Sequence, residues 1–274
     1  MADEQAELLA YYQRDEERDR LGRGVGRVEF ARTVEIVERT LPPPPARVAD
    51  IGGGPGRYVD WLSARGHDVV HRDIVPLHVE YVRAGHGDAV DTAVCDACDL
   101  DLLDESVDAV LLFGPLYHLR RREDRLRALQ EATRVVRPGG HVYAAAISRW
   151  AARLDGFLVQ RVDLAYPSTV DLISELERTG QMPPVHDSSF TGYSHRPAEL
   201  LEEIRESGLE VLSLVGVEAI AHALADVDQR MDDPIERMRL LDNLRAIESV
   251  PELLGASQHL LVTAQRARGR LRAR

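Results

Sequence analysis

Blocks of regularly spaced apolar residues run along this chain, and the spacing within each block predicts a secondary-structure element. Residues 6–21 and 27–41 have the spacing of two helices, and the second keeps its apolar residues mostly along one face. The glycine-rich segment between them, residues 22–27, follows a helix rather than a strand, so we interpret it as a flexible hinge. Four consecutive prolines, Pro42 to Pro45, are expected to end the second helix.

From residue 47 to residue 148, short apolar runs alternate with longer amphipathic segments. The runs predict strands, and the amphipathic segments predict helices. Alternation at this spacing is typical of a parallel sheet with helices on both faces, and ligands bind such sheets at the carboxyl ends of the strands. The expected strands are 47–51, 67–73, 89–97, 106–114 and 138–148, and the expected helices are 56–65, 76–85 and 122–136.

The pattern changes after residue 148, because residues 149–196 look mostly helical with loops and lack a strand repeat. This segment is too long for a simple connection, so we expect a helical cap inserted after the fifth strand. With the two N-terminal helices it would form a lid. A helix is expected at 197–208, a strand at 209–217, helices within 218–255 and a last strand at 257–265. The expected parts are a lid at 1–45, a main domain at 46–264 with its insertion at 149–196, and a basic tail at 265–274.

Composition narrows the classes of partner. The net charge is −12, which disfavours nucleic acid, because affinity for a phosphate backbone depends on clustered cations. The arginine-rich tail from Arg266 to Arg274 is an exception, which we interpret as a solvated chain end rather than an interaction segment. No apolar run approaches the roughly 18 residues of a membrane span, and the acidic N-terminus lacks a signal-peptide pattern. We therefore expect a cytoplasmic protein without a membrane partner.

Lysine and cysteine usage excludes further chemistry. All 34 cations are arginine, so the chain has neither the lysine of a Schiff base nor the lysine of a phosphate-binding P-loop. The only cysteines are Cys95 and Cys98. They could form a redox pair or half of a zinc site, but no second cysteine pair exists to complete a metal site. We expect inert thiols in a reducing compartment, and no metal.

The segment that follows the strand expected at 47–51 has glycine at every second position, in the pattern Asp50-x-Gly52-x-Gly54-x-Gly56. The dinucleotide fingerprint fails because Arg57 stands where its third glycine belongs, and the P-loop fails because Gly-Lys-Ser/Thr is missing. Glycines let the backbone approach a ligand closely, and Asp50 can attract a cationic ligand group. With no basic residue in the motif, the loop suits a zwitterion better than a triphosphate.

Two further acids follow the next two expected strands. Asp73 ends one strand, 17 residues after Gly56, where a carboxylate can accept hydrogen bonds from both ribose hydroxyls. Asp96 ends the next strand and can accept a hydrogen bond from an exocyclic adenine amine, with the N–H of Ala97 nearby for a ring nitrogen. A single Asp at a strand end is more often a turn or cap residue. Acids at three successive strand ends favour a nucleoside ligand instead.

Five segments resemble the successive motifs of class I S-adenosylmethionine-dependent methyltransferases: VADIGGGPGRY, VVHRDI, CDACDL, VDAVLLFGPLYHL and RVVRPGGHVYAA. The resemblance covers residues 46–148 well and the last two strands more loosely. It implies a Rossmann-like sheet of seven strands with the last one antiparallel, and S-adenosyl-L-methionine as the cofactor. The implied cofactor-binding residues are Gly52, Gly54 and Gly56 along the methionine part, Asp73 at the ribose, Asp96 and Ala97 at the adenine, Phe113 and Gly114 facing the sulfonium, and Asp50, Gly53 and Ile74 beside them.

The segment after the strand expected at 106–114 bears on the methyl acceptor. Methyl transfer needs an aligned acceptor, and a general base only where the acceptor carries a proton that must leave. Base-modifying methyltransferases carry Asn/Asp-Pro-Pro-aromatic here, whereas this chain has Gly114-Pro115-Leu116-Tyr117, without the acid, which disfavours nucleic-acid bases. Tyr117 and His118 are the candidate catalytic residues. Tyr117 would line the methyl site, and His118 would be either a base or a packing histidine under the lid.

The expected lid carries aromatic and charged candidates. Tyr11 and Arg20 could close over the cofactor, with Arg20 pairing with its carboxylate; the alternative is an exposed charged helix. Tyr12 and three residues of an expected loop before a helix are the substrate-binding candidates. That loop suits an aromatic wall for the acceptor, although surface placement fits it equally. The three loop residues are Phe190, Tyr193 and His195.

The sequence therefore predicts a methyltransferase that acts on an oxygen or nitrogen atom of a small molecule, such as a secondary metabolite. We expect it to be a monomer or a homodimer. The alternative is a non-catalytic S-adenosylmethionine-binding subunit that regulates or assists a partner. A nicotinamide oxidoreductase is disfavoured by the broken third glycine.

Overall fold

The computed structural model describes residues 2–12, 18–184 and 190–268, with side chains from residue 7 onward. The chain divides into two compact units, each made of three stretches of sequence. Unit 1 consists of Met1–Glu38, Ala146–Glu199 and Leu214–Leu261, and unit 2 consists of Arg39–Ala145, Leu200–Ser213 and Val262–Arg274.

Parallel strands form the centre of unit 2, in the order β3-β2-β1-β4-β5. In the register, Val48 of β1 pairs with Val69 on one side and Ala109 on the other. Strands β1 and β4 are largely buried on both faces, and charged side chains interrupt their apolar runs only at Arg47, Asp50 and Asp108. The bounds are β1 (Arg47–Ile51), β2 (Asp68–Asp73), β3 (Asp91–Val94), β4 (Val107–Leu112) and β5 (Val136–Ser148).

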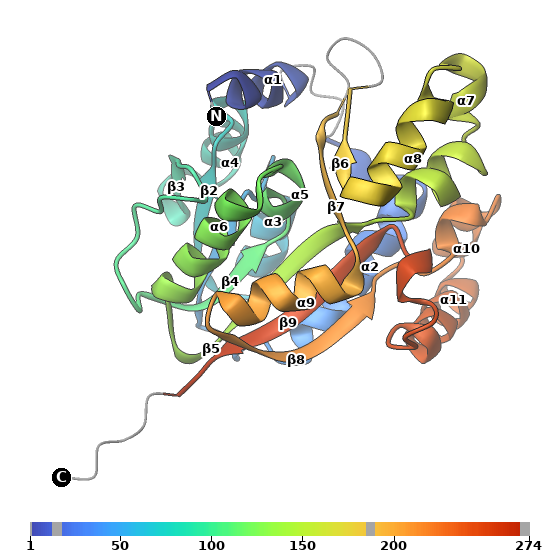
Figure 1. Cartoon of the computed structure of the whole chain (residues 1–274). Coiled ribbons are helices and arrows are strands. Elements are labelled where there is room, and N and C mark those ends of the chain that lie inside the picture. The colour runs from blue at the N-terminus through green and yellow to red at the C-terminus, as the bar shows by residue number, and fades with distance from the viewer. Residues whose placement is uncertain (1, 13–17, 185–189, 269–274) are drawn as a thin grey trace. The chain divides into compact units, whose positions relative to one another are not determined.

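Helices of unit 2 pack on these strands. Helix α3 contacts β1 and β2, α4 contacts β2 and β3, and α6 contacts β4; Figure 1 shows α4 beside β2 and β3. The amphipathic segments between the expected strands are therefore confirmed as helices. The bounds are α3 (Arg57–Ala64), α4 (Pro76–His86), η2 (Gly87–Ala89), α5 (Pro115–His118), α6 (Arg122–Val135) and α9 (Pro197–Glu206), the last of which begins in unit 1.

The last two expected strands are present as β8 (Leu209–Gly216) and β9 (His259–Arg266). Strand β9 pairs with both β5 and β8 and is the antiparallel last strand. The predicted Rossmann-like sheet is therefore confirmed, with β1 to β5, β8 and β9 as its seven strands. Two short strands, β6 (Gln181–Met182) and β7 (Gly192–His195), bring the sheet to nine strands.

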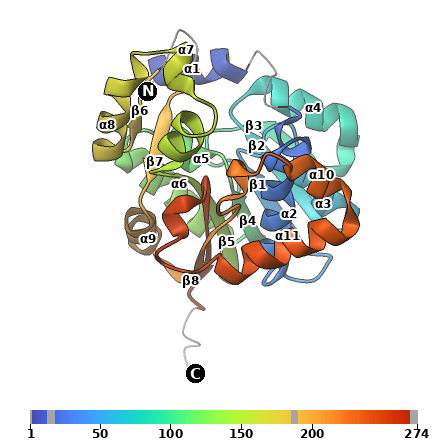
Figure 2. The same ribbon diagram turned by 90° about the vertical axis from the view of Figure 1, so that its right-hand side faces the viewer.

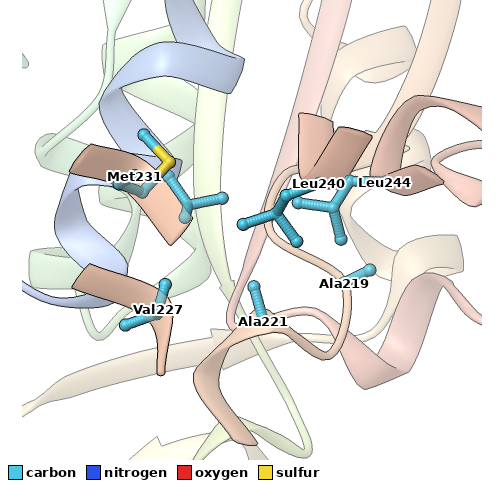
Figure 3. Packing of buried hydrophobic residues seen from close by; sticks show 7 residues of the cluster. Ala219, Ala221, Val227, Met231, Leu240 and Leu244 are labelled. Carbon is cyan, nitrogen blue, oxygen red and sulfur yellow. The ribbon is translucent and has the colours of Figure 1, made fainter. Parts of the chain in front are cut away.

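Unit 1 is largely helical. Figure 2 shows α2 beside α10 and α11, and Val28 of α2 packs into one apolar cluster with buried residues of α10 and α11. Figure 3 shows the cluster from close by, with Val227 and Met231 of α10 and Leu240 and Leu244 of α11. The bounds are α1 (Ala2–Tyr12), η1 (Arg20–Gly22), α2 (Val25–Glu38), the π-helical turn η3 (Ala152–Phe157), α7 (Val162–Ala165), α8 (Thr169–Thr179), η4 (Ala221–Ala223), α10 (Val227–Asp232), α11 (Pro234–Ile247) and η5 (Leu254–Ala256).

Two sequence-based interpretations are wrong. The glycine-rich segment 22–27 is not a hinge along its whole length, because α2 begins at Val25 and includes Gly26. A Cβ at Gly26 would collide with the backbone of Arg20, so the missing side chain lets η1 pack against α2. The inserted segment is not free of strands, because β7 pairs in parallel with the end of β5, Ile147 opposite Ser194.

Parts of the terminal predictions lie outside the described residues, namely 13–17 of the first expected helix and 269–274 of the basic tail. Arg266, assigned to that tail, belongs to β9 and hydrogen-bonds to the carbonyl oxygen of Val136 at 2.7 Å. Within the described residues, none of the helices has the length and apolar character needed to cross a membrane.

Candidate functional site

The glycine-rich loop begins where β1 ends and leads into α3. Gly52 and Gly54 have φ angles of +66° and +58°, in the left-handed region that favours glycine. A Cβ at Gly52 would lie 2.6 Å from Cδ of Pro115, whereas a Cβ at Gly54 would meet no atom within 4 Å. The loop therefore packs closely at Gly52 and leaves its backbone open at Gly54.

Asp73, at the end of β2, fastens this loop. Its Oδ2 accepts a hydrogen bond from the N–H of Gly54, and its Oδ1 accepts one from the N–H of Val75, both at 2.8 Å. Nδ1 of His78 lies 3.2 Å from the same Oδ1. Burial alone would raise the pKa of this carboxyl, but the hydrogen bonds from His78, Val75 and Gly54 outweigh it and lower the pKa. Asp73 is therefore an ionised group that ties the loop to β2, with Ile74 half-buried beside it.

Asp50, in β1, is the buried acid behind the loop. Its side chain is fully buried, and neither carboxyl oxygen has a hydrogen-bond partner among the described residues. A Cβ at Gly53 would lie 2.5 Å from Oδ2, so the loop packs directly against this carboxyl. Burial, helped by the negative charge of Asp73, raises the pKa of Asp50 to about 8. A buried carboxyl without a partner is costly, so a ligand with a cationic or hydrogen-bond-donating group fits this position.

The third predicted acid, Asp96, lies beyond the end of its strand, because β3 stops at Val94. The side chain of Asp96 accepts a hydrogen bond from the N–H of Cys98 at 2.8 Å, and its carbonyl accepts one from the N–H of Asp99 at 3.0 Å. These bonds make a turn that contains Ala97 and positions Asp96. The geometry agrees with the turn interpretation, and the predicted contact with adenine stays a prediction.

The two cysteines near this turn are free. Burial raises the pKa of Cys98 to about 12, and it also raises the pKa of Cys95. Both side chains are therefore protonated thiols rather than nucleophilic thiolates at neutral pH, which agrees with the expectation of inert thiols.

The segment after β4 meets the glycine-rich loop. A Cβ at Gly114 would lie 2.9 Å from the carbonyl oxygen of Gly52, so only glycine permits this close approach. The ring of Phe113 packs edge-on against the ring of Tyr58 in α3, with the ring centroids 4.8 Å apart. Two predicted cofactor segments, far apart in sequence, are therefore brought together in unit 2.

Tyr117 and His118 follow in the short helix α5. Their rings are 4.8 Å apart between centroids. Loss of solvent around the imidazole lowers the pKa of His118 to about 4, although the charge of Asp73 opposes the shift. The imidazole is therefore neutral at neutral pH but only weakly basic. Both interpretations of His118, as a base and as a packing residue, remain predictions.

In unit 1, three of the predicted lid residues gather. The ring of Tyr11 packs edge-on against the rings of Tyr12 and Phe190, with distances between ring centroids of 5.1 Å and 5.8 Å. Arg20 forms an ion pair with Glu29, with Nη2 2.9 Å from Oε1. The guanidinium predicted to bind the cofactor carboxylate is thus already engaged by a carboxylate of the chain, and its predicted role would require exchange of partners.

Tyr193 and His195 are buried in β7, so the expectation of a loop and the option of surface placement are wrong for them. Their rings meet edge-on at 4.8 Å. The buried guanidinium of Arg149 stacks 5.6 Å from the Tyr193 ring and donates to the carbonyl oxygen of Ser194 at 2.9 Å. The predicted contact of Tyr193 and His195 with the methyl acceptor stays a prediction.

Sequence reasoning missed a polar cluster in unit 1. Oε1 of Glu218 lies 2.5 Å from Nδ1 of His259, and Glu29 lies 3.8 Å from the same nitrogen. Ser257 donates a hydrogen bond to Glu218 at 2.8 Å. Burial alone would lower the pKa of His259, but the carboxylates of Glu29 and Glu218 raise it to about 9. The members of this cluster are far apart in the sequence. The only signals that could have indicated it were an acid just after β8 and a histidine at the start of β9.

Comparisons with known proteins agree with this geometry. Residues 49–144 match the model of a family described as a methyltransferase domain. A probable tRNA methyltransferase 9B of Bos taurus is 29% identical over 57% of this chain and 33% of its own length. An uncharacterized methyltransferase of Mycobacterium bovis is 33% identical over 60% of this chain and 71% of its own length. The chain thus spans about a third of the length of the tRNA methyltransferase 9B relative.

Solved structures show the same fold. A methyltransferase of Thermotoga maritima, described as a possible histamine N-methyltransferase, superposes with a TM-score of 0.60 at 19% identity, covering 94% of this chain and 97% of that one. The open loop at Gly54 and the unpartnered carboxyl of Asp50 also fit the cofactor that such proteins bind, S-adenosylmethionine. From its fold, its family match and its mycobacterial relative, the chain belongs to the class I S-adenosylmethionine-dependent methyltransferases.

Proposed function

We propose that this protein transfers the methyl group of S-adenosylmethionine to an oxygen or nitrogen atom of a small molecule, such as a secondary metabolite. The observation that carries the proposal is the buried carboxyl of Asp50 behind an open glycine loop. It suits the charged amino-acid end of the cofactor, because a buried acid without a partner is satisfied by a cation or a donor. Free thiols at Cys95 and Cys98 support a reducing, cytoplasmic location.

The residues proposed to hold the cofactor belong to unit 2, apart from Tyr11 and Arg20 of the proposed lid. The loop would line its methionine part, Asp73 would receive the ribose, and the turn at Asp96 would receive the adenine. When bound, S-adenosylmethionine supplies a methyl carbon activated by the positive sulfur. The complete proposed set is Asp50, Gly52, Gly53, Gly54, Gly56, Asp73, Ile74, Asp96, Ala97, Phe113 and Gly114, with Tyr11 and Arg20 from the lid.

The chain's own contribution to the transfer would be chiefly alignment. Holding acceptor and methyl group in line is worth about 7–11 kcal/mol in favourable cases, more than a single weak base supplies. Tyr117 would line the methyl site. His118 would take the acceptor's proton only in its neutral form, which is the form that its lowered pKa maintains.

The small-molecule class is supported by two features of the sequence. The segment Gly114–Tyr117 lacks the acid that binds the amine of a base in base-modifying methyltransferases. The net charge of −12 opposes a phosphate backbone. RNA is the second candidate acceptor, because one relative is named as a probable tRNA methyltransferase.

We also propose that residues 1–45 and the insertion at 149–196 act as a lid on the main domain, residues 46–264. The contact of Tyr11 with Phe190 supports joint movement of the first helix and the insertion. In this proposal Tyr11 and Arg20 approach the cofactor, and closure excludes water from the acceptor site. The residues proposed to contact the acceptor are Tyr12, Phe190, Tyr193 and His195.

The test has two stages. Thermal unfolding with S-adenosylhomocysteine, compared with NAD, should show a rise in Tm for the first ligand only, because a ligand that binds the folded state stabilises it. Radiolabelled methyl donor is then offered with phenols, amines and tRNA separately. Label in a phenol or amine supports the proposal, and label in tRNA alone overturns the acceptor class. Donor binding without any transfer favours the non-catalytic subunit.

A further inference from the structure

His71 is a buried histidine beside the glycine-rich loop to which the proposed function assigns no role. It lies in β2, two residues before Asp73, and its side chain is fully buried. Nε2 lies 3.1 Å from the carbonyl oxygen of Gly54, and Nδ1 lies 2.8 Å from Oγ1 of Thr92, in β3. Both ring nitrogens therefore have a partner, one in the loop and one in the neighbouring strand.

These partners fix the tautomer of the ring. A carbonyl oxygen only accepts hydrogen bonds, so Nε2 must carry the proton that it donates to Gly54. Burial lowers the pKa of His71, which keeps the ring neutral, so Nδ1 accepts the hydroxyl proton of Thr92. The hydroxyl of Thr92 thus orients the imidazole toward the loop.

Together with Asp73, the ring holds Gly54 at both of its backbone groups. Asp73 accepts from the N–H of Gly54, and His71 donates to its carbonyl. Residues two apart on a strand point to the same face, so the two side chains reach the loop from one surface of β2. The ring also packs against the preceding residue, Gly53, because a Cβ there would lie 2.7 Å from Cδ2 of His71.

We propose that His71 is a positioning residue for the methyl donor: its Nε2–H and the carboxylate of Asp73 clamp Gly54 and hold the loop in its binding conformation. The inference rests on the proposed function, because it assumes that this loop binds S-adenosylmethionine. Gly54 has a left-handed φ and open space around it, so hydrogen bonds from β2 replace the packing that would otherwise fix it. The clamp lowers the cost of ordering the loop when the donor binds.

Substitutions at His71 and Thr92 separate this role from simple packing. The amide nitrogen of glutamine reaches the place of Nε2, whereas that of asparagine reaches only the place of Nδ1. We expect His71→Asn to weaken S-adenosylhomocysteine binding about tenfold in calorimetry, the usual worth of one hydrogen bond. His71→Gln should recover most of that affinity, and Thr92→Val, which frees the ring to turn, should fall between them. His86→Asn, another histidine of unit 2, is the matched control and should bind as the unchanged protein does.

Two measurements do not depend on ligand binding. Nitrogen chemical shifts of the His71 ring in the unchanged protein should show the Nε2–H tautomer. Hydrogen exchange of residues 52–57 should be several-fold faster in His71→Asn than in His71→Gln, since only the first lacks the donor to Gly54. If His71→Asn is too unstable, the tautomer is still read in the unchanged protein. Loop exchange is then compared between Thr92→Val, which retains the ring but frees it to turn, and the unchanged protein, and it should be faster in Thr92→Val.

The outcomes are distinguishable. A ring in the Nδ1–H tautomer, or equal exchange of the loop in both variants, overturns the clamp whatever the protein binds. Equal donor affinity of His71→Asn and the unchanged protein overturns the positioning role and leaves the proposed function intact. If the unchanged protein does not bind S-adenosylhomocysteine while the tautomer and exchange results are as expected, the clamp stands and the proposed function fails.

Discussion

The two units use buried polar groups in different ways. In unit 2, Asp73 and His71 stand two positions apart on one strand and bind the same glycine, Gly54. In unit 1, buried charges are compensated largely by residues far away in the sequence: Arg32 of α2 pairs with Glu248 after α11, as well as with Glu35 of its own helix. Two residues of one strand can therefore hold a nearby loop, whereas compensation of buried charge brings together residues far apart in the sequence.

The difference extends to charge balance. Unit 1 pairs Arg149 with Glu199 and Glu218 with His259. Unit 2 pairs Arg125 with Glu203, yet it leaves the buried carboxyl of Asp50 without a hydrogen-bond partner among the described residues. The buried charges of these pairs are compensated within the chain, whereas the carboxyl of Asp50 is available to the ligand that we propose.

The largest effect is expected in unit 1, at the pair of Arg32 and Glu248. Glu248→Ala leaves a fully buried guanidinium short of one carboxylate, so the free energy of unfolding should fall by about 3 kcal/mol in urea denaturation. Arg32→Met combined with Glu248→Leu should recover most of the loss, because it removes both charges. Glu252→Ala, at an exposed position, is the control. A loss below about 1 kcal/mol would mean that Glu248 does not compensate Arg32.

A smaller, pH-dependent effect is expected at His259. Its pKa is raised from 6.5 to about 9, so its stabilising contribution is complete below pH 6.5 and disappears as the pH rises through 9. His259→Gln should lower the free energy of unfolding by about 2 kcal/mol at pH 6, and the difference from the unchanged protein should shrink toward pH 10. Glu218→Gln should move this decline to lower pH. A difference that is constant with pH would contradict the assigned pairing.

An effect of opposite sign is expected at Asp50. Its pKa is raised from 3.8 to about 8, so the unfolded chain releases this proton first, and stability falls as the pH rises from about 4 to about 8. Asp50→Asn should therefore be more stable than the unchanged protein at pH 8, and the gain should vanish near pH 4. The same variant should bind S-adenosylhomocysteine about tenfold more weakly, if the carboxyl meets a ligand donor.

Asp60→Asn is the matched control for Asp50→Asn, because the carboxylate of Asp60 is exposed in the same unit. It should change neither stability nor affinity. If Asp50→Asn were less stable than the unchanged protein at pH 8, Asp50 would have a partner in solution, and the contrast between the units would fail.

Most of unit 2 could be predicted from the sequence, because its signals are local. Asp50 and the glycines up to Gly56 lie within seven consecutive residues at the end of β1, and Asp73 ends the next strand. The role of His71 could not be predicted in the same way. A histidine inside an apolar strand carries no sign of which backbone atom its ring will meet, and only the register of β2 beside β3 and the loop decides it.

Unit 1 was less predictable for the same physical reason. The helical spacing of α2 and the mixture of helices after β8 were visible, but β7 was mistaken for a loop, because four residues pair only where the end of β5 offers an edge. The cluster of Glu29, Glu218 and His259 likewise exists only after folding.

The sequence by itself determined the alternation of strands and helices, the glycine loop with its acids, and hence the family, since all of these depend on residues close together in the chain. Only the tertiary structure decided which acids are ionised and which histidine reaches Gly54. Protonation and hydrogen bonding depend on burial and on neighbours brought from distant parts of the chain, and no local pattern encodes them.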